Sequence, residues 1–178
     1  MASWRAPHAS PPAPEGRQGL RFVFVDRILR LDPGAAIEIV KNVSAAEDVF
    51  DDHFPGVPIL PGALLVETFE QATQLLVGVT HDFARVARLD RVSRAAFRVL
   101  VRPGDQLSVT CRRRDPCPEP DRARWTVAAT AAVTGRTVAT ATLDITIVDD
   151  HDGVGERLRA LHRTLTRDAL ALVGIDPR

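Results

Sequence analysis

The segment HFPGVPILPGALLVETFEQATQLLVGV, residues 53–79, holds the strongest structural signals in the sequence. Its first ten residues contain three prolines and two glycines, so we expect an ordered loop rather than a regular element. Residues 63–79 are expected to form a helix whose apolar side chains point in nearly every direction. A helix of that kind is buried rather than laid on a surface. We therefore predict a domain built around one buried helix that follows a rigid loop.

Runs typical of β-strands lie on both sides of this helix. Before it come residues 20–31 and 35–43, separated by the turn signal Asp32-Pro33-Gly34, and residues 44–50 are expected to add one helical turn. After it come four more strand-like runs, at residues 95–102, 106–114, 122–133 and 136–148. This order predicts an α+β domain in which an antiparallel sheet wraps one helix.

The two ends of the chain are expected to lie outside this domain. Residues 1–19 are rich in proline, alanine and small polar residues, which bury too little apolar area to offset the entropy of ordering. Residues 153–174 have apolar positions at helical spacing and predict an amphipathic helix that Gly174 ends. The predicted division is a disordered tail at 1–19, the domain at 20–149 and a C-terminal helical extension at 150–178.

The composition excludes several classes of protein. The 23 basic residues balance the 23 acidic ones, which argues against nucleic-acid binding. No run is long and apolar enough to span a membrane, and the N-terminus lacks the apolar stretch of a secretory signal, so we expect a cytoplasmic location. Cys111 and Cys117 lack the companion ligands of a zinc site and are expected to be free thiols.

Two residues of the loop and helix could carry chemistry. Glu67 interrupts the apolar helix, and because burial raises the pKa of a carboxyl group, a glutamate there could serve as a general acid. Alternatively, Glu67 is a solvated residue on a helix that is less buried than its apolar side chains suggest. His53 opens the loop that leads to the helix N-terminus, where free N–H groups favour developing negative charge. It could act as a general base there, or only hydrogen-bond to a neighbour.

Taken together, these residues resemble a known family signature. The set is His53-Phe54-Pro55-Gly56, Pro58, Pro61-Gly62, Glu67 and Gln71. It resembles the hotdog-fold (3R)-hydroxyacyl-[acyl-carrier-protein] dehydratases of the FabZ type, in which a glutamate follows the histidine by the same 14 residues as here. The flanking runs FVFVDRILRLDPG, VKNVSAAEDVFDDHFPG and FRVLVRPGDQL look like the family's first strand, its approach to the loop and its later turn. The resemblance covers residues 20–148.

The resemblance implies a fold, an assembly and roles for the site residues. In the family, two hotdog units pair edge to edge, and the active site at their interface takes the histidine from one chain and the glutamate from the other. By position, His53 would abstract the α-proton of the thioester and Glu67 would protonate the departing 3-hydroxyl. The N–H of Gly62 would stabilise the enolate-like oxygen, with Gln71 in a supporting role. The rest of the implied loop site is Phe54, Gly56 and Pro61.

The implied reaction is the reversible dehydration of a 3-hydroxyacyl thioester to the 2-enoyl thioester, in fatty-acid or polyketide-type biosynthesis. No metal or organic cofactor is implied, because the thioester itself acidifies the α-carbon. The implied partners are an acyl chain on a phosphopantetheine arm, an acidic acyl carrier protein, and a second copy of the chain, with hexamers formed by some family members. The sequence leaves open the acyl length and whether coenzyme A replaces the carrier.

A series of arginines follows the helix at intervals of three or four residues. These residues could meet carboxylates of the carrier protein or the phosphate of the arm, or simply form a solvated face. On a strand, this spacing would scatter them over both faces. The series consists of Arg85, Arg88, Arg91, Arg94, Arg98 and Arg102.

Two other functions stay open at this point. The first is a hotdog acyl-thioesterase, and the second is a non-catalytic dimer that binds acyl thioesters. The chain also departs from the family, because it contains no tyrosine and has the short run Ser93, Arg94, Ala95 and Ala96 where larger residues are usual. Small side chains there would reshape an acyl tunnel and suggest a specialised pathway.

Overall fold

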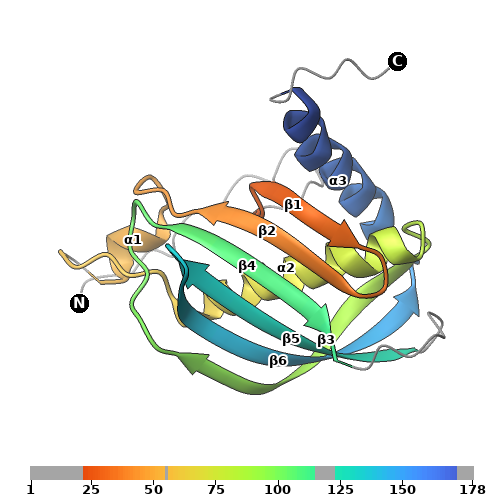
Figure 1. Ribbon diagram of the computed structural model, residues 1–178, viewed down its shortest axis with the longest axis horizontal. Helices are drawn as coiled ribbons and strands as arrows, with labels where there is room; N and C mark the ends of the chain where they lie inside the picture. The colour runs from red at the N-terminus through yellow and green to blue at the C-terminus, as the bar shows by residue number, and fades with distance from the viewer. Residues whose placement is uncertain (1–21, 55, 115–122, 172–178) are drawn as a thin grey trace, which may run out of the picture.

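The computed structural model describes residues 22–54, 56–114 and 123–171. Six strands and three helices are assigned in these ranges (Figure 1). In chain order they are β1 (Arg27–Asp32), β2 (Ala36–Asn42), α1 (Val49–Asp52), α2 (Gly62–Thr80), β3 (Arg85–Phe97), β4 (Gln106–Arg113), β5 (Arg124–Val133), β6 (Arg136–Asp149) and α3 (Val154–Ala171).

The strands form one antiparallel sheet in the order β1-β2-β4-β5-β6-β3. Figure 1 shows this sheet curving around α2, which lies along its concave side. The predicted α+β domain with a sheet wrapped around one helix is therefore confirmed. Strands β1 and β3 form the two edges of the sheet, so one side of β3 has no strand partner among the described residues.

Alternation along the strands builds the core. In β5 the side chains of Trp125, Val127, Ala129 and Ala131 are buried, because every second side chain of a strand faces α2. In β4, Cys111 is wholly buried, and its Sγ lies 3.6 Å from the backbone oxygen of Phe69 in α2. Burial raises the pKa of this thiol to about 12. Cys117 lies outside the described residues.

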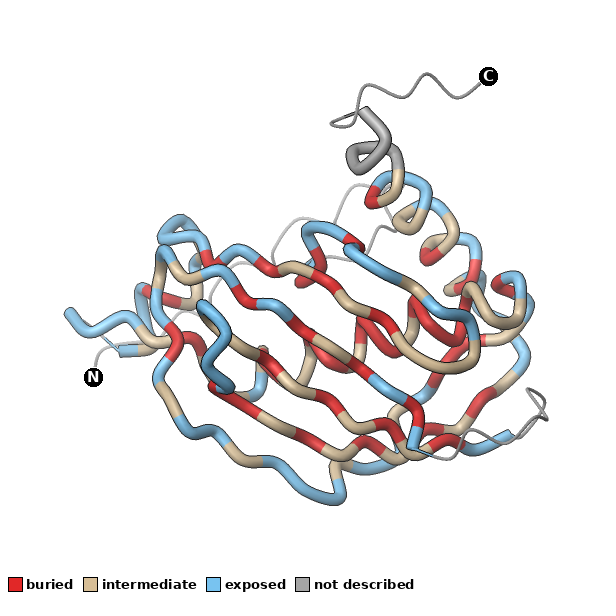
Figure 2. Tube along the Cα trace, in the orientation of Figure 1, coloured by how far each residue is buried: buried red, intermediate tan, exposed pale blue. Residues whose placement is uncertain are grey.

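Burial of α2 is uneven along its length (Figure 2). Phe69, Leu75 and Leu76 are fully buried, whereas Val66 and Glu67 near its start are only half-buried. The expectation of a helix buried on every side is therefore wrong for its first turns in the single chain. One sheet covers only one side of a helix, and this stretch needs another surface to cover the other side.

Several boundaries differ from those expected from the sequence. Strand β1 begins at Arg27 rather than at residue 20, and β3 runs from Arg85 to Phe97 rather than over 95–102. Pairing with β6 along this whole length, from Asp149 to Ala139, sets the extent of β3. The helical turn expected over 44–50 lies instead at α1, residues 49–52. Thr134 and Gly135, between β5 and β6, both have positive φ, as a tight hairpin turn requires.

Helix α3 follows β6 directly and packs on the domain. Asp150 caps it, because its carboxylate accepts hydrogen bonds from the N–H groups of Val154 and Gly155, each at 2.9 Å. Leu158 is fully buried and Leu165 nearly so, within the same core as α2. Gly174, the expected end of the helix, lies outside the described residues. Within the described part of the chain, none of the helices combines the length and the apolar character needed to cross a membrane.

Candidate active site

His53 lies between α1 and the proline-rich loop. Its N–H donates to the oxygen of Val49 at 3.1 Å, and its own carbonyl accepts from the N–H of Ile59 at 3.1 Å. The ring Nδ1 lies 2.8 Å from the carbonyl oxygen of Ile59. A carbonyl oxygen only accepts hydrogen bonds, so Nδ1 carries a proton and donates it there. In the neutral ring, Nε2 is then the nitrogen with a free lone pair.

The loop brings the chain to the start of α2 through a contact with the segment after β3. The N–H of Leu60 donates to the oxygen of Val101 at 2.8 Å, and Pro61 accepts from the N–H groups of Leu64 and Leu65. Among the described residues, the N–H of Gly62 has no hydrogen-bond acceptor. This group is one of the free donors that every helix N-terminus presents.

The aromatic ring of Phe97 packs directly on Gly62. A Cβ at position 62 would lie 3.0 Å from two carbon atoms of that ring, which is closer than ordinary van der Waals contact. Glycine is thus required for this close approach, and the half-exposed Phe97 forms a wall beside the helix N-terminus. No local pattern in the sequence indicates this contact, because it joins residues from two different elements.

Glu67 and Gln71 are one helical turn apart on α2 and are hydrogen-bonded. Gln71 Nε2 donates to Glu67 Oε1 at 2.8 Å and to the backbone oxygen of Phe22 at 3.0 Å. Gln71 Oε1 accepts from the N–H of Phe24 at 2.8 Å. The buried amide therefore fixes one oxygen of Glu67, and Glu67 Oε2 has no hydrogen-bond donor among the described residues.

A second carboxylate, Glu70, lies on the same helix face as Glu67. Burial, with the nearby charge of Glu67, raises the pKa of Glu70, against the opposing effect of a hydrogen bond from Gln74. From the sequence, this residue was expected only as one of the polar interruptions of the helix, with no chemical role. The spacing of three residues within a helix was the signal that could have found it, since such residues are neighbours on the helix surface.

Within the single chain the candidate residues form two groups rather than one. His53, Phe54 and Gly62 belong to the loop and the helix start, whereas Glu67 and Gln71 lie further along α2. No hydrogen bond or ion pair joins His53 to Glu67. Phe54 and Gly56 are exposed, and Gly56 has a φ of +78°. Pro55 lies outside the described residues. Among the residues that the structure does describe, no group of His, Cys, Asp and Glu side chains could hold a metal ion.

Several large apolar side chains of the described residues are exposed. They come from the segment that Gln71 holds, from β1, from the loop after His53, and from the end of β3 and beyond. The set is Phe22, Val23, Leu29, Phe54, Val57, Phe97 and Leu100. Exposed apolar surface of this kind marks a contact region. One member of the set, Phe22, is linked to α2, because its backbone oxygen accepts a hydrogen bond from Gln71 Nε2.

The arginine series divides into two parts in the structure. The first three residues, which lie on β3, form ion pairs: Arg85 with Asp149, Arg88 with Asp90, and Arg91 with Asp144. Arg94, Arg98 and Arg102 form no ion pair with a described residue. The arginines of this series that form no ion pair therefore lie at the end of β3 and beyond it, near the hydrogen bond between Leu60 and Val101.

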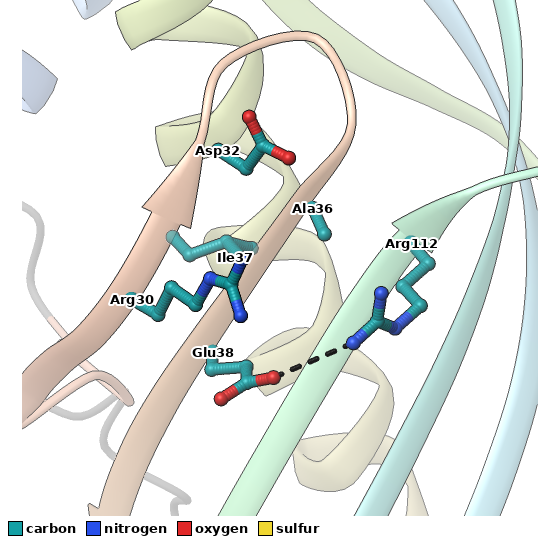
Figure 3. Close-up of a pocket in the computed structure, with 6 residues that line it drawn as sticks. All are labelled: Arg30, Asp32, Ala36, Ile37, Glu38 and Arg112. Atoms are coloured by element: carbon teal, nitrogen blue, oxygen red, sulfur yellow. Dashed lines mark hydrogen bonds and ion pairs between the residues drawn. The ribbon is translucent and has the colours of Figure 1, made fainter. Parts of the chain in front are cut away.

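A small hollow of about 20 Å³ lies elsewhere, on the face of β1, β2 and β4 that points away from α2 (Figure 3). Its lining includes Arg30, Asp32, Glu38 and Arg112, and Glu38 pairs with Arg112 at 3.5 Å. The hollow contains none of the candidate site residues. It is too small for a substrate, and its charges neutralise each other.

The fold and the loop–helix geometry define the class of this protein. A curved antiparallel sheet wrapped around one long helix is the hotdog fold, and in this chain a histidine-bearing loop leads to the start of that helix. The model of the FabA-like domain matches residues 18–142, so the chain belongs to the FabA-like family. Helix α3 lies after the matched residues.

Relatives and solved structures agree with this assignment. The chain is 42% identical over 89 residues to the 3-hydroxyacyl-[acyl-carrier-protein] dehydratase FabZ of Levilactobacillus brevis, covering 49% of this chain and 60% of that protein. It is 40% identical over 97 residues to the protein of that name from Wolbachia pipientis wMel, covering 54% and 68%. A hot-dog-like protein from Thermanaerovibrio acidaminovorans shares the fold, with a TM-score of 0.54, 17% identity and coverage of 73% and 92%.

Proposed function

We propose that this protein dehydrates 3-hydroxyacyl thioesters to 2-enoyl thioesters, with His53 as base and Glu67 as acid. The observation that carries the proposal is that hydrogen bonds orient the side chains of both His53 and Glu67. The carbonyl of Ile59 directs the lone pair of His53 to Nε2, and Gln71 holds one oxygen of Glu67 and leaves the other open. The relatives described above are named as dehydratases of this kind, although the Levilactobacillus brevis protein is covered over only 60% of its length.

In the proposed reaction, His53 Nε2 removes the proton from the α-carbon. The electron pair of that C–H bond forms the new double bond as the bond from the β-carbon to the hydroxyl breaks. The N–H of Gly62 donates to the thioester oxygen while it carries negative charge, as preorganised donors do in other acyl sites. Because Gly62 begins α2, the positive end of the helix dipole adds to this stabilisation.

Glu67 supplies the proton that turns the departing hydroxide into water. Its Oε1 already accepts from Gln71, so the acidic proton belongs on Oε2, the oxygen that is free to reach a substrate. After water leaves, the proton taken by His53 returns to Glu67 through solvent, which restores both groups. The reaction consumes no oxidant or other reactant, and its reverse is hydration of the enoyl thioester.

We propose that the working unit is a homodimer of the hotdog domain, residues 20–149, with residues 150–178 as an added helical extension. Three observations support it. His53 and Glu67 of one chain do not contact each other, the Glu67 face of α2 is half-buried, and β3 is an open edge of 13 residues. Open strand edges and exposed apolar side chains favour pairing with another copy. The proposed substrate carrier is an acyl carrier protein that works with the enzyme in the cytoplasm.

The test measures the interconversion of a 3-hydroxyacyl thioester and its enoyl product for the wild type, His53→Ala and Glu67→Gln. Both variants are expected to lose about 100-fold or more in kcat, while circular dichroism and size-exclusion chromatography stay unchanged. Asp51→Asn, an exposed change on α1, serves as a matched control and should retain activity. Release of free thiol by the wild type would instead indicate a thioesterase, and binding without turnover would indicate a non-catalytic dimer.

A further inference from the structure

A lysine lies at a core-facing position of β2. Ile37 and Ile39 are fully buried on one face of this strand, and Lys41, the next residue on the same face, is buried as well. It is the only lysine in the chain. A buried ammonium group is costly unless it is paired and hydrogen-bonded. The partners of Lys41 therefore show what the residue holds together, and the mechanism above does not use it.

The first set of contacts leads towards the loop that carries His53. Lys41 Nζ donates to Glu47 Oε1 and to the carbonyl oxygen of Asn42, both at 2.7 Å. The same Oε1 of Glu47 also accepts from the N–H of Ser44 at 3.2 Å. The ammonium group and the carboxylate together fix the turn between β2 and α1.

Helix α1 transmits this position to the histidine. The carbonyl oxygen of Glu47 accepts from the N–H of Phe50 at 3.1 Å, and the Phe50 ring is buried in the core. At the other end of α1, the N–H of His53 donates to the oxygen of Val49. A helix of one turn is not stable by itself, so the place of α1, and with it the place of His53, depends on contacts such as that of Glu47.

The second contact of Lys41 leads towards Glu67. Its Nζ lies 5.7 Å from the centroid of the Phe24 ring, within the range of a cation–π interaction, and both side chains are buried. The N–H of Phe24 donates to Gln71 Oε1, and the same amide of Gln71 holds Glu67 Oε1. The ammonium group thus contacts the residue to which the support of Glu67 is attached.

We propose that Lys41 is a positioning residue for both catalytic groups of its chain. It holds the turn before α1 through Glu47 and the segment before β1 through Phe24. The inference rests on the proposed function, because it takes His53 and Glu67 as the reacting groups. Loss of the ammonium group should displace both of them while the groups that bind the substrate stay in place.

The kinetic test uses Lys41→Met, which keeps an unbranched side chain of similar length and removes the charge and the hydrogen bonds. Because a small displacement of a catalytic group is costly, kcat for dehydration is expected to fall about 10- to 100-fold. KM should stay within about threefold, as it does when a change acts on the reacting groups alone.

The matched control is Ile39→Ala, which removes buried packing from the same face of β2. This variant should lower the stability of the protein, whereas kcat of its folded form should stay within about twofold of the wild type. An unchanged kcat in Lys41→Met overturns the proposal. Equal losses of kcat in Lys41→Met and Ile39→Ala would assign Lys41 a general structural role and overturn it as well.

Two further variants each remove one contact of the ammonium group. Glu47→Gln removes the charge partner on the α1 side, and Phe24→Leu removes the aromatic ring while it keeps an apolar side chain. Each should lower kcat by less than Lys41→Met does, and each should add little when combined with Lys41→Met, because residues in contact act non-additively. Additive losses overturn the proposal. If Lys41→Met does not fold, an unchanged kcat in both of these variants overturns it instead.

Hydrogen exchange keeps this proposal separate from the proposed function, because it needs no substrate. The amides of Phe24 and Ile59 report on the two segments, since each donates a hydrogen bond there. In Lys41→Met both are expected to exchange faster relative to the amide of Val109 in β4, whereas Ile39→Ala should leave these ratios unchanged. Unchanged ratios in Lys41→Met overturn the proposal whether or not the protein is active. If the wild type converts no thioester, the proposed function fails and hydrogen exchange still decides the role of Lys41.

Discussion

Gln71 donates from Nε2 to Glu67 Oε1 at 2.8 Å, while its Oε1 accepts from the N–H of Phe24 at the same distance. One buried amide thereby links the candidate acid to the backbone segment that precedes β1. The bond to the oxygen of Phe22 uses the second N–H of the amide, so its orientation is fixed by its partners. Glu67 therefore depends for its position on a segment more than 40 residues earlier in the chain.

Replacing Gln71 by alanine is expected to lower kcat by roughly 100-fold, because a misplaced catalytic group can cost that much. Substrate binding involves other groups, so KM should change far less. Steady-state kinetics of dehydration checks both values. Gln74→Ala is the matched control, since it removes the corresponding amide beside Glu70. Equal loss of kcat in the two variants would contradict a specific role for Gln71 in holding Glu67.

The contact between Gly62 and Phe97 predicts coupling between two distant positions. In Gly62→Ala, the new methyl group would meet the Phe97 ring at 3.0 Å, and overpacking of this kind costs about 1–3 kcal/mol in the free energy of unfolding. Displacement of the ring should also lower kcat. Phe97→Ala in the same chain removes the obstacle and is expected to recover part of both losses.

A double-mutant cycle measures this coupling through urea unfolding of the wild type, the two single variants and the double variant. Residues in contact give interaction energies well above the error of additivity, whereas independent residues do not. Strict additivity would mean that Phe97 moves aside without cost, and the close approach would then not explain the glycine.

The sequence was most informative where one element determines its own structure. The loop rich in proline and glycine, helix α2 and the alternating strands β2, β4, β5 and β6 were all predicted close to their observed bounds, because turn residues and side-chain periodicity act locally. Strand β3 was only partly predicted. Its register shifts, between Leu89 and Arg91 and between Val92 and Arg94, interrupt the alternation that a strand normally shows.

The candidate site was predictable as residue types but not as contacts. His53 and Glu67 could be chosen from their place in the loop and helix. The Ile59 carbonyl that orients the His53 ring and the tether from Gln71 to Phe24 both depend on tertiary packing. The division of the arginines into paired and unpaired groups likewise required the positions of two carboxylates on β6 and of Asp90 on β3.

Glu70 is expected to destabilise the folded protein near neutral pH. Its folded-state pKa lies above the ordinary value of 4.5, chiefly because burial disfavours the charged form. The folded state therefore binds this proton more tightly than the unfolded state, so stability falls as pH rises above about 4.5. Glu70→Gln should raise the free energy of unfolding at pH 7, because the neutral amide has no charge to desolvate on folding.

Thermal unfolding at pH 4 and pH 7 tests this expectation. The gain of Glu70→Gln over the wild type should be present at pH 7 and shrink towards pH 4, because protonation of Glu70 then reduces the charge difference between the two proteins. Glu47→Gln provides a contrast of opposite sign, because Glu47 pairs with the buried Lys41 at 2.7 Å and its loss should destabilise the protein. A gain for Glu70→Gln that is the same at both pH values would contradict a charge effect.

Helix α3 lies outside the region matched by the family model, yet its side chains belong to the domain core. Leu158 is fully buried in the same cluster as the α2 side chains. Leu158→Ala should therefore lower the free energy of unfolding by about 2–5 kcal/mol, as truncation of a buried leucine does. Leu161→Ala, the same truncation at a half-buried position of α3, should cost clearly less.

Chemical denaturation gives both free energies of unfolding. If α3 folded separately, Leu158→Ala would leave the main unfolding transition unchanged, and hydrogen exchange in α3 would become independent of exchange in α2. A single unfolding transition that shifts to lower denaturant concentration would instead establish that α3 unfolds together with the sheet and α2.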